Sequence, residues 1–296
     1  MEIGFGQPFL APAKLNLSLR ITGRRDDGYH LLESEMELLG LCDTLFFFPE
    51  HPGVVKRLWG APGVSEENDL AVRSARLLQT LFPQIGVALA IRKSIPMGAG
   101  LGGGSSDAAV TIIALNHLFS LGLDQAEMMA LGARLGADVP FFIFGEPALA
   151  TGIGESLLPR DFTPGWVVVA APSAQVSTRL AFSLWDEKSA RKTSLTKVSS
   201  FGKIPFSKMP GNDLQEVVEE VFPEVARVRS WLSSFGAAQM TGSGAAVFMK
   251  AASREEGESI LRQAPLEWWV RLLPVWRRHP LFHLAHKKAP CGKTPL

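Results

Sequence analysis

The chain has 296 residues, 46% of them hydrophobic and 20% charged, which excludes an intrinsically disordered protein and leaves room for one large or two ordinary domains. Its 30 basic and 29 acidic side chains nearly cancel, which argues against a nucleic-acid or membrane-surface partner, and no apolar run reaches the roughly 18–20 residues of a spanning helix. Two cysteines, Cys42 and Cys291, form no disulfide or metal motif, and the N-terminus has no signal-peptide pattern, so we expect a cytoplasmic protein.

The first half of the chain alternates between strand and helix patterns, which predicts a mixed α/β fold. Strand patterns are short runs in which apolar residues dominate or alternate with polar ones, and helical segments repeat apolar residues every three to four positions. The third helix begins with Asp124 and Glu127, a pair typical of a capping box. The predicted strands cover residues 14–21, 45–48 and 87–91, and the predicted helices cover residues 69–82, 106–118 and 124–136.

The second half begins with an all-apolar strand at residues 166–171. We place a domain boundary near residue 165, which separates an N-terminal domain (1–165) from a smaller C-terminal domain (166–296). Residues 186–211 are rich in Lys, Ser, Thr and Pro, a composition typical of a mobile connector or lid. The remaining predicted elements are a helical region at 211–235 and strands at 246–249 and 270–273.

A glycine-rich segment lies between the predicted strand at 87–91 and the helix at 106–118. Residues 98–104 contain five glycines, far more than 28 glycines spread over 296 residues would place there by chance. Glycine is tolerated where a backbone must bend sharply or approach a ligand closely. The N–H groups and the positive dipole end of the following helix suit an anionic phosphate. The segment therefore indicates a phosphate-binding loop.

The same glycines are compatible with other kinds of loop. The simplest alternative is a flexible structural turn. Gly98, Gly100 and Gly103 also satisfy the dinucleotide-binding pattern, which requires an acidic residue about 20 positions later, at the end of a second strand. The acid at that distance is Asp124, which begins a helix instead. No lysine follows the glycines, so the Walker A pattern fails, and a loop for a nucleoside triphosphate of non-Walker type is favoured.

Three single residues also stand out. Asp138 adjoins an apolar run over residues 139–144. Removing a carboxylate from water is costly, so an aspartate in this place is either a cap or turn residue or has a functional partner. Lys14 lies in an apolar strand, where a lysine is usually a solvated edge residue. Tyr29 is the only tyrosine beside 18 phenylalanines, so its place in a polar loop indicates a binding residue or a packed loop aromatic.

Three motifs resemble the superfamily of galactokinase, homoserine kinase, mevalonate kinase and phosphomevalonate kinase (GHMP kinases). They are PAKLNL at 12–17, the glycine-rich loop, and TGSGAAVF at 241–248. The resemblance implies a two-domain α/β (α+β) fold with ATP bound between the domains. The loop residues that it implies in ATP binding are Pro96, Met97, Gly98, Ala99, Gly100, Leu101, Gly102, Gly103, Gly104, Ser105 and Ser106.

Two further motifs, DGYHLLES at 27–34 and GADVPF at 136–141, are similar to one family of that superfamily, the 4-diphosphocytidyl-2-C-methyl-D-erythritol kinases. The resemblance extends over about residues 11–282 and implies ATP-dependent phosphorylation of the 2-hydroxyl of a cytidyl diphosphate alcohol, in non-mevalonate isoprenoid synthesis. Another kinase of the superfamily has no use for the pyrimidine contact implied at Tyr29. A non-catalytic sensor on the same fold needs neither Lys14 nor Asp138.

The same resemblance assigns roles to individual residues. Asp138 is expected to be the general base and Lys14 its partner, which also offsets charge on the reacting oxygen. Asn16, two residues along the strand and on the same face, is expected to hold substrate hydroxyls. Tyr29 is expected to stack on a pyrimidine and His30 to contact its edge. Mg²⁺ is expected to accompany ATP without a dedicated set of protein ligands.

Overall fold

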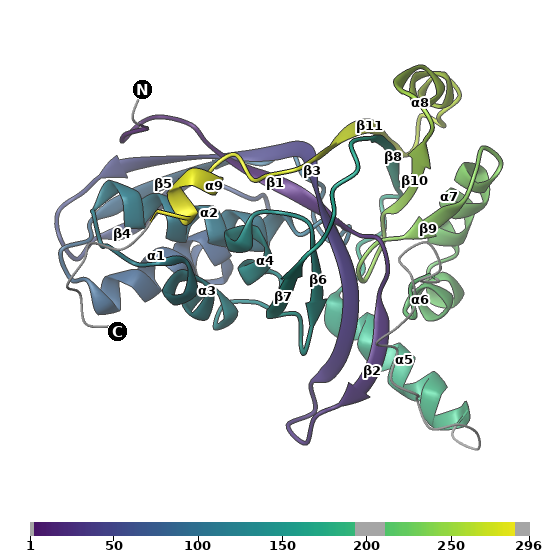
Figure 1. Ribbon diagram of the computed structural model, residues 1–296, viewed down its shortest axis with the longest axis horizontal. Helices are drawn as coiled ribbons and strands as arrows, with labels where there is room; N and C mark the ends of the chain where they lie inside the picture. The colour runs from purple at the N-terminus through teal and green to yellow at the C-terminus, as the bar shows by residue number, and fades with distance from the viewer. Residues whose placement is uncertain (1–2, 193–210, 288–296) are drawn as a thin grey trace.

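The protein is described by a computed structural model that covers residues 3–192 and 211–287 (Figure 1). The N-terminal half is a sheet with helices packed against it, and a 3-10 turn at Glu66–Asn68 precedes its first helix. Its strands are β1 (Phe9–Asn16), β2 (Arg20–Arg24), β3 (His30–Pro49), β4 (Val55–Trp59), β5 (Val87–Arg92), β6 (Ala148–Thr151) and β7 (Ser156–Pro159), and its helices are α1 (Leu70–Leu81), α2 (Gly103–Leu118), α3 (Gln125–Ala133) and α4 (Val139–Phe144).

The C-terminal half continues the sheet and ends with a short helix that returns to the N-terminal half beside α2 (Figure 1). No helix among the described residues is long and apolar enough to cross a membrane. The strands of this half are β8 (Trp166–Ala171), β9 (Ala238–Met240), β10 (Val247–Ala251) and β11 (Trp269–Trp276), and its helices are α5 (Thr178–Lys192), α6 (Gln215–Val221), α7 (Pro223–Ser233), α8 (Arg254–Leu261) and α9 (Phe282–Ala285).

The 20-residue strand β3 organises the sheet, because it pairs with β1, β2, β5, β6 and β11. The last of these, β11, pairs with β3 through Val275 and Trp276 and with β8 through the rest of its length. The strands of both halves therefore form one sheet, in which β11 joins β3 of the N-terminal half to β8 of the C-terminal half (Figure 1). The domain boundary near residue 165 stays a prediction.

Helix α2 is the central helix of the N-terminal core. Every residue from Ser106 to Leu115 is buried, so the helix is enclosed on all sides. Small residues such as Ala108 and Ala114 allow this, because they let β1 and α1 approach the helix closely. A helix buried this completely has little freedom to tilt, so the loop that precedes it is held in a defined place.

Several predicted elements differ in detail from the structure. The strand expected at 14–21 is two strands, because Leu19 leaves β1 and pairs with Asn212 instead. The helical region at 211–235 is divided by Pro223, which has no N–H to continue α6. The predicted connector at 186–211 begins too early, since residues 186–192 belong to α5, and residues 193–210 lie outside the described part of the chain.

Two carboxylates of β3 face the junction between the halves. Glu35 and Glu37 are both at least 96% buried, with Arg160 at 3.9 Å from Glu35 and Lys250 at 3.8 Å from Glu37. Burial is the main cause that raises the pKa of Glu35 from 4.5 to about 7, and the neighbouring Glu37 adds to it. The folded state therefore holds this proton more tightly than the unfolded chain, and stability falls as pH rises from 4.5 through 7.

We expect Glu35→Gln to remove much of this pH dependence, because the amide cannot ionise. Relative to the wild type, the variant should gain on the order of 1–3 kcal/mol of stability between pH 5 and pH 8. Thermal unfolding followed at both pH values measures this difference, with exposed Glu267→Gln as the matched control. Equal shifts of the melting temperature at pH 5 and pH 8 would contradict the assignment to Glu35.

Candidate active site

A cavity of about 970 Å³ lies where the N-terminal and C-terminal halves meet. It brings together residues from all five sequence motifs, although these are spread over more than 200 positions of the chain. The predicted site residues that line it are Lys14, Asn16, Tyr29, His30, Gly98, Gly100, Gly102, Gly103, Gly104, Ser105 and Asp138, and Gly242 and Ser243 of the TGSGAAVF motif join them.

Lys14 and Asp138 lie next to each other in this cavity. The Lys14 Nζ is 3.3 Å from Asp138 Oδ2, and the lysine side chain is only 4% exposed whereas the aspartate side chain is 37% exposed. Asp138 occupies the N-cap position of α4, but its side chain makes no capping hydrogen bond. The carboxylate is therefore available to the cavity, and its charged contact among the described residues is the buried ammonium group of Lys14.

Asn16 positions this lysine. Its Oδ1 accepts a hydrogen bond from Lys14 Nζ, and its Nδ2 donates to Ser34 Oγ at 2.6 Å. Its backbone N–H donates to Thr241 Oγ1 at 2.8 Å, which links β1 to the C-terminal half. The side chain of Asn16 is thus largely engaged within the protein, and one N–H of its amide remains for a hydroxyl.

The two glycine-containing loops pack backbone against backbone. The N–H groups of Ala245 and Ala246 donate to the carbonyls of Gly98 and Ala99, at 3.3 and 3.1 Å. At Gly100, whose φ is +75°, a Cβ would lie 2.4 Å from the carbonyl oxygen of Thr241. A side chain at this position would separate the loops, which explains the glycine in physical terms.

The glycine-rich loop leads directly into α2, and its role in phosphate binding stays a prediction. Gly102 adopts a left-handed conformation at the N-cap of this helix. The first N–H groups of the helix have no intrahelical acceptor and point out of its N-terminal end. Ser105 lines the cavity. Ser106 does not, because it is fully buried within α2, where its hydroxyl has no partner among the described residues.

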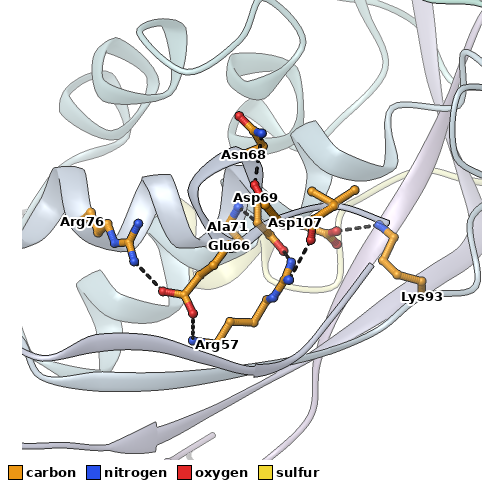
Figure 2. A network of polar contacts seen from close by, with 10 residues as sticks. Arg57, Glu66, Asn68, Asp69, Ala71, Arg76, Lys93 and Asp107 are labelled. Atoms are coloured by element: carbon orange, nitrogen blue, oxygen red, sulfur yellow. Dashed lines mark hydrogen bonds and ion pairs between the residues drawn. The ribbon is translucent and has the colours of Figure 1, made fainter. Parts of the chain in front are cut away.

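A smaller cavity of about 250 Å³ adjoins the same loop and is also lined by Pro96, Met97, Ala99 and Leu101. Asn68 and Asp69, both labelled in Figure 2, form part of its wall. Asp69 caps α1 by accepting from the N–H of Ala71, and its other oxygen pairs with Arg57 at 2.6 Å. Both carboxylate oxygens of Asp69 are therefore already engaged.

Below the loop, Lys93 lies between two buried carboxylates. Its Nζ is 2.5 Å from Asp43 and 2.6 Å from Asp107, and the latter contact is visible in Figure 2. Burial raises the pKa of Asp107 to about 8. Asp43 also accepts from the N–H groups of Ser94 and Ile95, so the cluster holds the residues on both sides of the glycine loop. Sequence reasoning missed this cluster, whose members are separated by long stretches of chain.

The opposite end of the larger cavity is aromatic. The His30 ring stacks on Phe182 with the centroids 4.7 Å apart and the planes 19° apart, and Nε2 lies 2.7 Å from Asp186 Oδ1. Tyr29 beside it is 61% exposed. Phe182 and Asp186 were not predicted as site residues, because nothing in their local sequence shows that α5 packs against the start of β3.

Some of the basic side chains that line the cavity have a carboxylate partner among the described residues, and one does not. Lys14 contacts Asp138, and Arg24 lies 3.5 Å from Asp186. Arg179, in the first turn of α5, also lines the cavity but has no carboxylate partner among the described residues. It lies one helical turn from Phe182, on the side nearer the glycine loops, since neighbouring Thr178 contacts Ser243 at 3.1 Å. An uncompensated guanidinium there suits an anionic group.

Comparison with known proteins is consistent with this geometry. The model of the GHMP kinases N-terminal domain matches residues 69–146, and that of the GHMP kinases C-terminal domain matches residues 198–269. The chain is 45% identical over 280 residues to the 4-diphosphocytidyl-2-C-methyl-D-erythritol kinase of Janthinobacterium sp. (strain Marseille), covering 93% of this chain and 96% of the relative. The kinase of the same name from Herminiimonas arsenicoxydans is 46% identical over 279 residues, with the same coverage.

Solved structures agree. A crystal structure of 4-(cytidine 5'-diphospho)-2C-methyl-D-erythritol kinase superposes with a TM-score of 0.71 at 34% identity, over 90% of this chain and 99% of the other. Homoserine kinase from Cytophaga hutchinsonii superposes with a TM-score of 0.65 at 14% identity, over 92% and 95%, and so shares the fold alone. By its sequence and by its two-part fold, this chain belongs to the 4-diphosphocytidyl-2-C-methyl-D-erythritol kinase family of the GHMP kinases.

Proposed function

We propose that this chain transfers the γ-phosphoryl group of ATP to the 2-hydroxyl of 4-diphosphocytidyl-2-C-methyl-D-erythritol, yielding the 2-phosphate and ADP, in non-mevalonate isoprenoid precursor synthesis. The observation that carries the proposal is the contact between Lys14 and Asp138 at the point where the two glycine loops meet. A general base, a cation and a phosphate loop within one cavity are the parts that phosphoryl transfer to an alcohol requires.

In the proposed reaction Asp138 accepts the proton of the 2-hydroxyl as its oxygen forms a bond to the γ-phosphorus. The bond from that phosphorus to the bridging oxygen breaks, and its electron pair leaves with ADP. Lys14 offsets the negative charge that develops on the transferred group, and its burial strengthens this effect. Asn16 and Ser34 keep the ammonium group at the reacting atoms.

The triphosphate is proposed to bind at the N-terminus of α2, with the nucleoside directed toward the smaller cavity. Mg²⁺ would neutralise part of the triphosphate charge. The described residues contain no group of three or more carboxylate, histidine or cysteine side chains placed to hold a metal. Phosphate oxygens and water are proposed to hold this ion chiefly, and the Ser105 hydroxyl, which lines the larger cavity, is the proposed protein contact.

The cytidyl end of the substrate is proposed to occupy the aromatic end of the cavity. Tyr29 and the stacked His30 and Phe182 rings provide flat surfaces for a pyrimidine. Arg179 lies between these rings and the glycine loops, where a diphosphate linking the base end to the reacting alcohol would pass. Pairing with that diphosphate would give this guanidinium, which has no carboxylate partner in the part of the chain that the structure describes, a counter-ion.

Phosphorus NMR of the reaction mixture tests the proposal. With ATP and the cytidyl diphosphate alcohol, one new monophosphate ester should form beside an unchanged diphosphate, together with ADP. Homoserine and mevalonate, tested in parallel, should not be phosphorylated. Phosphorylation of either of these, with none of the cytidyl compound, would refute the proposed substrate and leave the kinase fold in place.

We expect Tyr29→Ala to lower kcat/KM for the cytidyl substrate by about 5- to 150-fold, because base–aromatic stacking is worth roughly 1–3 kcal/mol. The KM for ATP should barely change, since Tyr29 lines only the larger cavity. Steady-state kinetics with each substrate varied in turn provide the measurement.

The matched comparison for Tyr29→Ala uses 2-C-methyl-D-erythritol 4-phosphate, which has the alcohol but no cytidine. Wild type and variant should both use it poorly and about equally. A loss of the same factor on both compounds would show that Tyr29 supports the fold and not the base.

A further inference from the structure

Asp186 is the one carboxylate of α5 that lines the active-site cavity, and it contacts His30 directly. The Nε2–Oδ1 distance of 2.7 Å is that of a strong hydrogen bond. The other oxygen of Asp186 lies 3.5 Å from the guanidinium of Arg24, which also lines the cavity. The carboxylate is therefore held from two sides, by one ring and by one cation.

This contact determines which nitrogen of His30 carries the proton. An ionised carboxylate only accepts hydrogen bonds, so the 2.7 Å contact requires that Nε2 be the donor. In the neutral ring Nδ1 then bears the lone pair and acts as an acceptor. Nδ1 makes no hydrogen bond to any residue that the structure describes. Stacking on Phe182 and the edge contact of Trp185, with centroids 5.7 Å apart, fix the plane of the ring.

An acceptor in this place distinguishes between pyrimidines. Cytosine carries an amino donor at position 4, whereas uracil carries a carbonyl oxygen there. A ring nitrogen with a lone pair accepts a hydrogen bond from the amino group of cytosine. It cannot form one with the carbonyl oxygen of uracil, because both groups are acceptors. The opposite tautomer, with hydrogen on Nδ1, would reverse this preference. The choice of base thus depends on a proton that a residue far along the chain holds in place.

We propose that Asp186 is a positioning residue for base selection, which fixes His30 in the Nε2–H tautomer and so makes the site prefer cytidyl over uridyl substrates. The inference rests on the proposed function, because it assumes that the aromatic end of the cavity binds the base. Asp186 itself touches no base in this arrangement. Its effect passes through His30, and Arg24 keeps its carboxylate oriented.

Isothermal titration of the full chain with CDP and with UDP tests the proposal. The wild type should bind CDP at least about 10-fold more tightly than UDP, since a mismatched acceptor leaves a polar group unpaired. Asp186→Ala should reduce this ratio by about 5-fold or more, whereas Asp186→Asn, whose amide oxygen can still accept from Nε2–H, should reduce it less. Glu187→Gln is the matched control on the next position of α5, where the side chain is exposed, and it should leave the ratio unchanged.

Long-range ¹H–¹⁵N NMR of the imidazole groups provides a readout that a merely structural role would not change. The His30 signals, identified by their loss in His30→Gln, should show the Nε2–H tautomer in the wild type and a mixture of tautomers in Asp186→Ala. Parallel losses of CDP and UDP affinity, or an unchanged tautomer, would overturn the role of Asp186. Equal binding of CDP and UDP by the wild type would overturn base selection alone, and absence of CDP binding would overturn the proposed function as well.

Discussion

Asp138→Asn is expected to lower kcat by roughly 10²–10⁴-fold, the usual contribution of general-base catalysis, while substrate binding is retained. The amide has the same shape as the carboxylate but cannot accept the proton of the attacking hydroxyl. Asp138 makes no capping hydrogen bond to α4, so the substitution removes no structural contact of that kind. Its side chain is also 37% exposed, which further limits the effect on stability.

Measurements of kcat, of CDP binding and of melting temperature separate chemistry from folding for Asp138→Asn. Asp161→Asn, at an exposed position in the same half of the chain, is the matched control and should retain wild-type kcat. Retention by Asp138→Asn of more than a tenth of wild-type kcat would show that Asp138 is not the base.

Lys14→Met is expected to lower kcat by roughly 10²–10³-fold, the range seen when one preorganised electrostatic donor is removed from an active site. Methionine keeps the length of the stem, which is tightly packed, since a Cβ at Gly102 would lie 2.9 Å from Lys14 Cγ. The loss should therefore come from the ammonium group and not from a cavity. The KM for ATP should change less than kcat, because the charge matters most in the transition state.

The double variant Asp138→Asn/Lys14→Met tests whether the two residues act as one unit. Their side chains are in contact at 3.3 Å, so each substitution removes part of what the other contributes. We expect the combined loss of kcat to be close to that of the more damaging single variant. Losses that multiply would instead mean that Lys14 and Asp138 contribute independently, and that the contact between them is not part of the mechanism.

Local patterns in the sequence predicted much of the secondary structure. The apolar run at 166–171 is strand β8, and the capping box that begins with Asp124 is formed as predicted at the start of α3. Strand alternation, capping pairs and glycine spacing act over a few neighbouring residues, so the local sequence contains the information needed. The strand at 45–48 was recognised only as a fragment, because the rest of β3 owes its length to pairing with five other strands.

The sequence by itself determined the candidate chemistry of this protein, namely a phosphate loop at 98–106, a lysine, an aspartate and an aromatic–histidine pair. The tertiary structure decided which groups meet: it places Lys14 against Asp138, packs the loop at 241–244 onto the glycines, and turns α5 so that Asp186 reaches His30. Residue type and short spacing are properties of a segment alone. Contacts between distant segments arise only when the sheet and its helices bury their apolar faces together, so neither the hydrogen-bond partner of His30 nor the position of Arg179 in the cavity is visible in the chain before it folds.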